Sequence, residues 1–151
     1  MQEIWKDIEG YEGLYQVSNK GRVKRVPTVV RRVQKNGLII YQPVKEKILK
    51  AGVRKDNYLT VALCKDGKSK SFLVHRLVAE SFIQNINNFP VINHKDENKQ
   101  NNDFRNLEWC TSEYNNTYNG IALRRQKNKK KHWKYIDGRK VYYNDISEVI
   151  C

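Results

Sequence analysis

The sequence lacks an apolar run long enough to cross a membrane. A membrane-spanning helix needs about 20 consecutive, mostly apolar residues, and charged or amide side chains interrupt every apolar stretch of this chain well before that length. The first residues, MQEIWKDIEG, also lack the charged-then-apolar order of a secretory signal peptide. We therefore expect a cytoplasmic protein with no membrane partner.

Cysteine is scarce and poorly placed for cross-linking or metal binding. The chain has three cysteines, Cys64, Cys110 and Cys151, which are far apart and form no C-x-x-C pair. An odd, dispersed set favours neither a disulfide framework nor a zinc knuckle. We expect three ordinary reduced thiols.

Acidic residues are few compared with basic ones. The 151 residues contain 29 Lys+Arg against 16 Asp+Glu, a formal net charge of +13. This excess predicts a polyanionic partner, most commonly nucleic acid, although a merely solvated basic surface remains an alternative. The aromatic content of 11% favours a folded binder over a disordered basic tail, and the length allows one compact domain or two small modules.

The first two thirds of the chain read as short strands and hairpins. Residues 1–25 alternate apolar and polar positions around a turn at residues 18–21, which predicts short antiparallel strands. The segments VVRRVQ and GLIIYQPV indicate a loop or a hairpin. The segment NYLTVALCKDGKSKSFLVHRL predicts a hairpin with its turn at residues 66–68.

The hydrophobic period changes from two to that of a helix near His75. In HRLVAESFI the apolar side chains fall on one helical face, which predicts two to three turns of helix. The segments VINH and LEWCT then read as two short strands, followed by a basic helix, SEYNNTYNGIALRRQKNKKKH, that Gly120 could interrupt. A hairpin around residues 137–138 follows, and Ser147 with Glu148 looks like a helix cap, so we expect the chain to end inside a longer module.

The loop between VINH and LEWCT is crowded with amides, because residues 93–106 include five asparagines. A strand that ends in a histidine, an amide-rich loop, a second strand and a helix together resemble the HNH endonucleases of the phage and intron homing type. In that family a ββα-metal finger presents one histidine and one metal ion to a scissile phosphate. EIWKDIEGYEGLYQVSNKGRV also resembles the N-terminal module of these enzymes, and VHRLVAESFI resembles the helix before their finger.

The resemblance implies an α+β fold in three parts. Residues 1–50 would form an N-terminal DNA-binding module with a small antiparallel β-sheet. Residues 51–118 would form the ββα-metal, or His-Me finger, nuclease core. Residues 119–151 would form a basic C-terminal helix and hairpin extension, with a shortened DNA-recognition module as one interpretation.

The resemblance also assigns candidate catalytic residues. His94, Asn106 and Asn115 take the places of the three motif residues, at spacings of 12 and 9 residues. His94 would be the general base, Asn106 would bridge backbone groups so that His94 is aimed correctly, and Asn115 with Asn93 would bind the metal. Many relatives carry an aspartate where this chain has Asn93.

Phosphodiester hydrolysis explains these residue types. It needs a base to take a proton from water and a cation to neutralise charge on the phosphate and leaving oxygen. A histidine with a pKa near 6.5 can be that base at neutral pH, and Mg²⁺ or Mn²⁺ suits amide and phosphate oxygens. Because neutral amides attract a dication less than carboxylates do, we expect weak metal binding without DNA. The other loop residues, Asp96, Asn98, Asn101 and Asn102, can satisfy the loop backbone.

The basic residues predict contacts with the DNA backbone, which supply affinity and register but not base specificity. A dispersed solvated face is the alternative. The predicted DNA-binding residues are Arg22, Lys24, Arg25, Arg31, Arg32, Lys65, Lys68, Lys70, Lys95, Arg124, Arg125, Lys127, Lys129, Lys130 and Lys131. We interpret His75 as a capping or packing residue, with DNA contact as the alternative, and Trp109 as part of the core.

The hypothesis that fits these features best is a metal-dependent homing endonuclease that hydrolyses double-stranded DNA at a long, degenerate site. One finger per chain implies a monomer that nicks one strand, with a homodimer as the alternative, and the resemblance implies a phage protein in the host cytoplasm. Two other hypotheses stay open: a DNA-binding remnant or regulator with a weakened nuclease site, and an RNA-binding module. The RNA-binding hypothesis explains the charge but not the His-Asn-Asn spacing.

Overall fold

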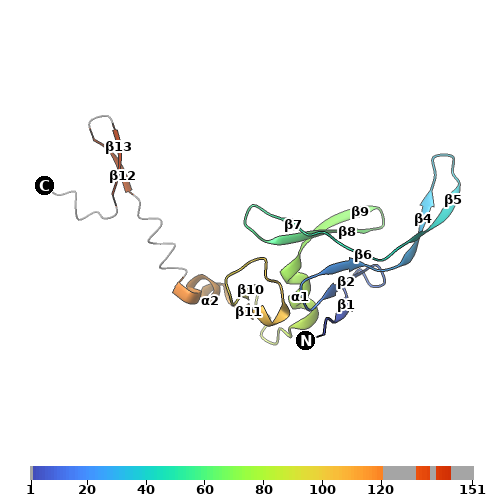
Figure 1. Ribbon diagram of the computed structural model, residues 1–151, viewed down its shortest axis with the longest axis horizontal. Coiled ribbons are helices and arrows are strands. Elements are labelled where there is room, and N and C mark those ends of the chain that lie inside the picture. Colours follow the sequence, from blue (N-terminus) through green and yellow to red (C-terminus); the bar gives the residue numbers. More distant parts are fainter. Residues whose placement is uncertain (1, 121–131, 137–138, 144–151) are drawn as a thin grey trace. The chain divides into compact units, whose positions relative to one another are not determined.

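The structure is a computed structural model that describes residues 2–120, 132–136 and 139–143. The chain divides into two compact units, Met1–Cys110 and Thr111–Cys151, which are described separately. The elements are short strands with few helices, so the fold is α+β as the sequence predicts (Figure 1).

A four-stranded antiparallel sheet opens the first unit. Its strand order is β1-β2-β3-β6, with β1 at Trp5–Asp7, β2 at Tyr15–Ser18, β3 at Val23–Arg25 and β6 at Lys47–Ile48. Val17 on β2 pairs with Val23 on β3, and both side chains are buried. The predicted turn joins these strands, and Gly21 there adopts the left-handed backbone conformation that glycine tolerates best (φ +78°).

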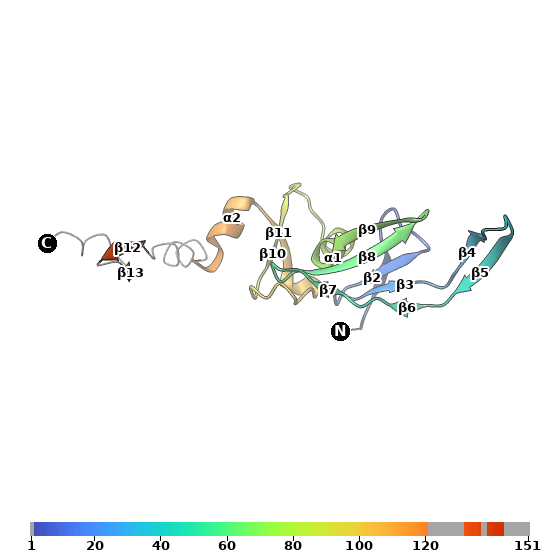
Figure 2. The same cartoon turned by 90° about the horizontal axis from the view of Figure 1, so that it is seen from above.

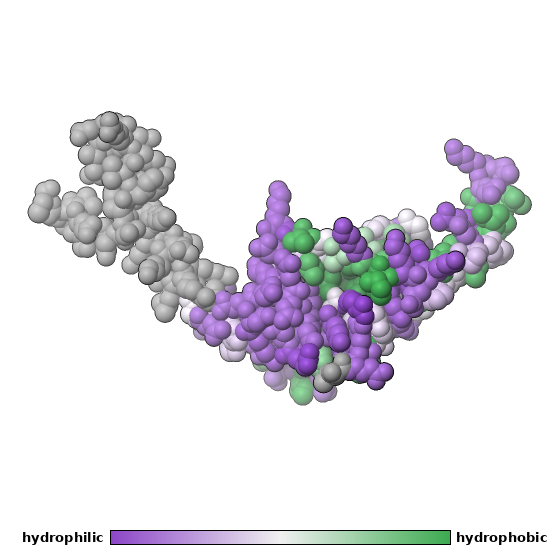
Figure 3. Space-filling model, viewed as in Figure 1, coloured by the Kyte–Doolittle hydropathy of each residue, from purple (hydrophilic) through white to green (hydrophobic). Residues whose placement is uncertain are grey.

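Two further sets of strands follow. Strands β4 (Thr28–Val33) and β5 (Ile39–Val44) form a hairpin that extends away from the rest of the unit in both views (Figures 1 and 2). Val29, Val33 and Tyr41 on it are more than half exposed, and the hairpin surface is partly apolar in Figure 3. The second set is a three-stranded sheet of β7 (Gly52–Val53), β8 (Leu59–Lys65) and β9 (Lys68–Leu73), and its β8–β9 turn lies where the sequence predicts it.

Helix α1 (Val74–Phe82) is the predicted helix, and its apolar face completes the core. Val74, Leu77 and Val78 are buried against residues of the surrounding strands. After α1, strands β10 (Val91–His94) and β11 (Leu107–Cys110) pair antiparallel, separated by the amide-rich loop and the short 3₁₀ helix η1 (Phe104–Asn106). Trp109 packs against the core as predicted, and its indole N–H donates to the Ile83 carbonyl 3.0 Å away, which ties β11 to the end of α1.

The second unit begins with helix α2 (Ser112–Thr117), whose first turn is capped by the Thr111 hydroxyl accepting from the Tyr114 N–H. A 3₁₀ turn, η2 (Tyr118–Gly120), follows, with positive φ at Asn119 and Gly120. Strands β12 (His132–Ile136) and β13 (Arg139–Tyr143) form the predicted hairpin. The predicted cap at Ser147 and Glu148 lies outside the described residues. Within the part of the chain that the structure describes, no helix is long and apolar enough to cross a membrane.

Candidate active site

The loop after β10 is closed by Asn106. Its amide oxygen accepts from the Asp96 N–H at 3.1 Å, and its amide nitrogen donates to the Asn101 carbonyl at 2.8 Å and to the Asp96 carboxylate at 2.9 Å. The Asp96 carboxylate also accepts from Asn98 and Asn101, and these hydrogen bonds, that of Asn101 foremost, hold the pKa of Asp96 below its usual range. The Asn106 side chain thus bridges both sides of the loop, which is the geometry expected for the middle asparagine of the His-Asn-Asn motif.

His94 is the last residue of β10, and its side chain points into the unit. The residue is 4% exposed, and its Nε2 lies 3.1 Å from Oδ1 of Asn102. Burial lowers the pKa of His94, while the hydrogen bond to Asn102 and the charge of Asp96 act in the opposite direction. The net lowering favours the neutral imidazole at neutral pH, which is the form that can accept a proton.

Two more rings surround His94. The ring of His75, at the start of α1, meets it edge to face with centroids 5.2 Å apart, and the ring of Tyr58 lies 4.8 Å from His75 and 5.9 Å from His94. Burial, followed by the charges of His94 and Arg76, lowers the pKa of His75 to about 4. His75 is therefore a neutral packing residue at pH 7, and its buried Nδ1 has no hydrogen-bond partner among the described residues.

Asn93 is buried beside His94, and its amide nitrogen donates to Oε1 of Glu108 at 2.8 Å across the strand pair. This contact leaves the amide oxygen as the atom that could ligate a cation, with a carboxylate close by. The described residues contain no cluster of three or more His, Cys, Asp and Glu suited to a metal. A hard divalent ion that keeps phosphate and water ligands still fits an amide oxygen next to a carboxylate.

Asn115, the other predicted metal ligand, lies on α2 in the second unit. Its backbone N–H donates to the Thr111 carbonyl at 3.1 Å. Its role at the metal stays a prediction.

Several predicted DNA-binding residues already have protein partners. Arg22 pairs with Glu3, Lys24 with Glu46, and the Arg25 guanidinium donates to the Lys45 carbonyl. Such exposed pairs are weak and can be exchanged for phosphate contacts. Arg31 and Arg32 lie on β4, exposed and without an ion pair among the described residues. The predicted DNA contacts in the second unit, residues 124–131, lie outside the described residues.

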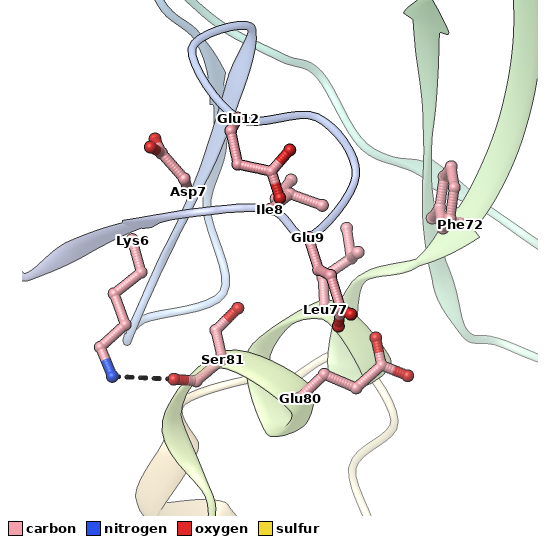
Figure 4. Close-up of a pocket in the computed structure, with 9 residues that line it drawn as sticks. All are labelled: Lys6, Asp7, Ile8, Glu9, Glu12, Phe72, Leu77, Glu80 and Ser81. Carbon is pink, nitrogen blue, oxygen red and sulfur yellow. Dashed lines mark hydrogen bonds between the residues drawn. The ribbon is translucent and has the colours of Figure 1, made fainter.

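A pocket of about 360 Å³ between the β1–β2 region and α1 is lined by charged side chains that are mainly acidic, unlike the basic residues predicted to bind DNA. Asp7, Glu9, Glu12 and Glu80 line it, and Lys6 crosses its edge to bond the Ser81 carbonyl at 2.9 Å (Figure 4). Carboxylates repel a phosphate backbone. This face is therefore not the one on which we expect DNA.

Sequence reasoning missed three neighbours of the candidate site. Asn102 carried no sign that it, rather than another asparagine of the loop, would bond His94. Tyr58 lies in a separate strand segment, and Gly21 belongs to a turn in the N-terminal sheet yet packs against Asn102. The one available signal was the glycine at position 21 in the predicted turn, because glycine in a turn can mark a positive φ that another residue would strain.

Separate parts of the chain match two protein families. Residues 3–64 match the NUMOD4 motif, and residues 72–117 match an HNH endonuclease family. The DNA endonuclease I-HmuI of Bacillus phage SP01 is 44% identical over 111 residues, which are 74% of this chain and 54% of that protein. The uncharacterized HNH endonuclease L245 of Acanthamoeba polyphaga mimivirus is 43% identical over 76 residues, 50% of this chain and 23% of that protein.

A solved structure is also similar, one described as "DNA binding and cleavage by the HNH homing endonuclease I-HmuI". It aligns with a TM-score of 0.58 at 37% sequence identity and covers 93% of this chain and 78% of the solved chain. The similarity therefore extends through both the N-terminal sheet and the β10–β11 finger, although the chain spans about half the length of I-HmuI itself (54%).

Proposed function

The chain belongs to the family of HNH homing endonucleases, and we propose that it cleaves double-stranded DNA by metal-dependent phosphodiester hydrolysis. The observation that carries the proposal is the placement of His94: an imidazole at the end of β10, whose pKa is lowered by burial, held by a loop that Asn106 closes. DNA as the substrate is supported by the net charge of +13 and by the family.

In the proposed reaction, His94 takes a proton from a water molecule whose oxygen attacks phosphorus. The new P–O bond replaces the bond to the 3′ oxygen, which leaves as a 3′-hydroxyl after protonation by solvent, and the other product carries a 5′-phosphate. A bound Mg²⁺ or Mn²⁺ would neutralise charge on the phosphate and the leaving oxygen. Asn93 would hold it through its amide oxygen with Asn115 as a second ligand, and Asn106 keeps the loop in place.

The described part of the chain has one such finger, so we propose that a monomer nicks one strand, whereas a homodimer would make a double-strand break. Arg31, Arg32 and the other basic residues would contact phosphates along a long, loosely read site. A monomer with this arrangement needs no symmetric target.

Burial is the observation that favours a second function, a DNA-binding protein without cleavage. His94 is 4% exposed, and Asn93 offers a metal a neutral amide oxygen rather than a carboxylate. Both features reduce what a base and a metal can contribute. The same basic surface would then serve binding or regulation alone.

Relaxation of supercoiled plasmid separates the two functions. We expect the protein to nick plasmid with Mg²⁺ or Mn²⁺ but not with EDTA, and we expect His94→Ala to bind duplex DNA as tightly as the parent protein without nicking it. Gel-shift binding is the folding control for this variant. Equal relaxation by both proteins would contradict the catalytic assignment, and absence of nicking by the parent protein with intact binding would favour the second function. Preferential competition by duplex RNA over duplex DNA would contradict DNA as the partner.

A further inference from the structure

We propose that Asn102 and Gly21 are positioning residues for His94: Asn102 fixes which ring nitrogen of His94 carries the proton, and Gly21 in the N-terminal sheet gives Asn102 the space to do so. The inference rests on the proposed function, because it concerns the orientation of the proposed base. It adds two residues to the site, one of them from an element distant in sequence.

The contact between Asn102 and His94 determines the tautomer. The amide nitrogen of Asn102 donates to the Gln100 carbonyl at 3.4 Å, so the oxygen 3.1 Å from Nε2 of His94 acts as the acceptor. An acceptor at Nε2 requires a proton on Nε2 and leaves the lone pair on Nδ1. Both residues are buried, at 3% and 4% exposure, so water competes weakly for this bond. Nδ1 is therefore the atom of His94 that is ready to accept a proton.

Gly21 lies directly against Asn102. A methyl group built on Gly21 would come within 2.6 Å of the Cβ of Asn102 and 3.0 Å of its carbonyl oxygen, distances at which the neighbour must move. The atoms in the way are backbone and Cβ atoms, which cannot rotate aside as the end of a flexible side chain could. A side chain at position 21 would thus displace the residue that holds His94.

The turn that carries Gly21 is itself firmly anchored. The Ser18 hydroxyl accepts from the N–H groups of Lys20 and Arg22, and both Ser18 and Asn19 are buried. The Asn19 carbonyl accepts from the Phe104 N–H at 2.9 Å, at the start of η1. The turn therefore packs against the loop at two places, and the N-terminal sheet fixes the position of Asn102.

Glycine at position 10 offers a matched control. Gly10 has nearly the same φ (+77° against +78°), but a methyl group built on it meets nothing within 4 Å. Gly10→Ala and Gly21→Ala therefore both place a side chain at a positive φ, and only Gly21→Ala crowds Asn102. A difference between these two variants reports the contact with Asn102.

Nitrogen NMR of the full chain labelled with ¹⁵N-histidine reads the tautomer directly, at about pH 8, above the ordinary histidine pKa of about 6.5. We expect His94 to show a protonated Nε2 and an unprotonated Nδ1 in the parent protein, in Gly10→Ala and in Asn102→Asp, which keeps the acceptor oxygen. We expect Asn102→Ala and Gly21→Ala to shift both signals toward the average of the two tautomers. A proton on Nδ1 in the parent protein, or an unchanged His94 in Asn102→Ala, would overturn the role of Asn102.

Two results would overturn the positioning role of Gly21. One is the same His94 spectrum in Gly21→Ala and Gly10→Ala. The other is a Gly21→Ala protein that fails to fold while Gly10→Ala folds, since Gly21 would then be purely structural. The Asn102 variants test the hydrogen bond in either case.

Cleavage kinetics give the second measurement. By analogy with residues that orient metal-site ligands, Asn102→Ala should lower kcat about 10- to 100-fold with KM little changed, and Gly21→Ala should lower kcat less in the Asn102→Ala background than in the parent protein. An equal loss in the two backgrounds would overturn the link between the two residues. If the parent protein does not cleave DNA, the proposed function fails, whereas the NMR result still decides whether Asn102 and Gly21 orient His94.

Discussion

His75 illustrates how a buried histidine can affect stability without taking part in chemistry. It packs between Tyr58 and His94, near Arg76 and Asp56, and its pKa is lowered to about 4. Below about pH 6.5 His75 becomes protonated in the unfolded chain. In the folded protein it stays mostly neutral until the pH falls to about 4. The free energy of unfolding should therefore fall as the pH decreases through this window, by at most about 3 kcal/mol from this group.

His75→Phe tests this expectation, because phenylalanine keeps an aromatic ring at the position and removes the titration. Urea unfolding at about pH 7 and about pH 4.5, on either side of most of that window, should show a smaller loss of stability for the variant than for the parent protein. The same loss in both proteins would show that other groups set the pH dependence.

Asn93 and Glu108 allow a test of metal binding that does not require cleavage. In Asn93→Asp a carboxylate would replace the amide that donates to Glu108 at 2.8 Å, in a buried position. Without metal we expect this variant to be less stable than the parent protein by about 1–3 kcal/mol, because a hydrogen bond becomes a like-charge contact. A divalent ion at this site would relieve the repulsion.

Thermal unfolding of Asn93→Asp with EDTA and with Mg²⁺ measures that relief. The melting temperature of the variant should rise more with Mg²⁺ than that of the parent protein, and the double variant Asn93→Asp with Glu108→Gln should regain stability in EDTA. An identical response of variant and parent protein to Mg²⁺ would count against a metal at Asn93.

Some residues around His94 could be predicted from the sequence and others could not. The motif spacing proposed His94 as the base, which stays a prediction, and Asn106 as a residue that bridges the loop, which its hydrogen bonds match, because both lie in one continuous loop and its flanking strands. The contact of Asn102 with His94 depends on the exact path of the loop, and those of Tyr58 and Gly21 depend on the packing of separate elements. Local patterns contain neither kind of information.

At the scale of elements, two hairpins and helix α1 were predictable because their signals are local. Alternating apolar residues and turn residues predicted β8–β9 and β12–β13, and a helical apolar stripe predicted α1, whereas β4–β5 was expected as a loop or a hairpin. The pairing of β6 with β3 and of β7 with β8 was not predicted. Two-residue strands carry almost no periodic signal, and β6 and β3 also lie far apart in the sequence.

The β4–β5 hairpin is the element whose role in binding is easiest to test. It carries Arg31 and Arg32 at exposed positions and projects from the first unit. If each side chain contacts one phosphate, Arg31→Ala and Arg32→Ala should each weaken DNA binding and reduce the log-log salt slope by about 1. Lys6→Gln, beside the acidic pocket, is the control and should leave the slope unchanged. An equal effect of all three substitutions would indicate general electrostatics rather than contacts by the hairpin.

At the scale of the whole molecule, the charge of +13 should govern DNA affinity. Neutralising about six to eight phosphates would give a log-log dependence of the association constant on salt with a slope of about −5 to −7. Fluorescence anisotropy with a long duplex at several salt concentrations measures the slope. A flat dependence would contradict binding through the basic residues.

Sequencing the ends released from a random-site duplex library with Mg²⁺ or Mn²⁺ tests the central claim most directly, that this chain is a nuclease whose base is His94. The account predicts breaks in one strand with 3′-hydroxyl and 5′-phosphate ends, at a constant position within a long degenerate site, and no such ends from His94→Ala. The same ends at the same positions from the His94→Ala protein, or ends without any shared site, would contradict it.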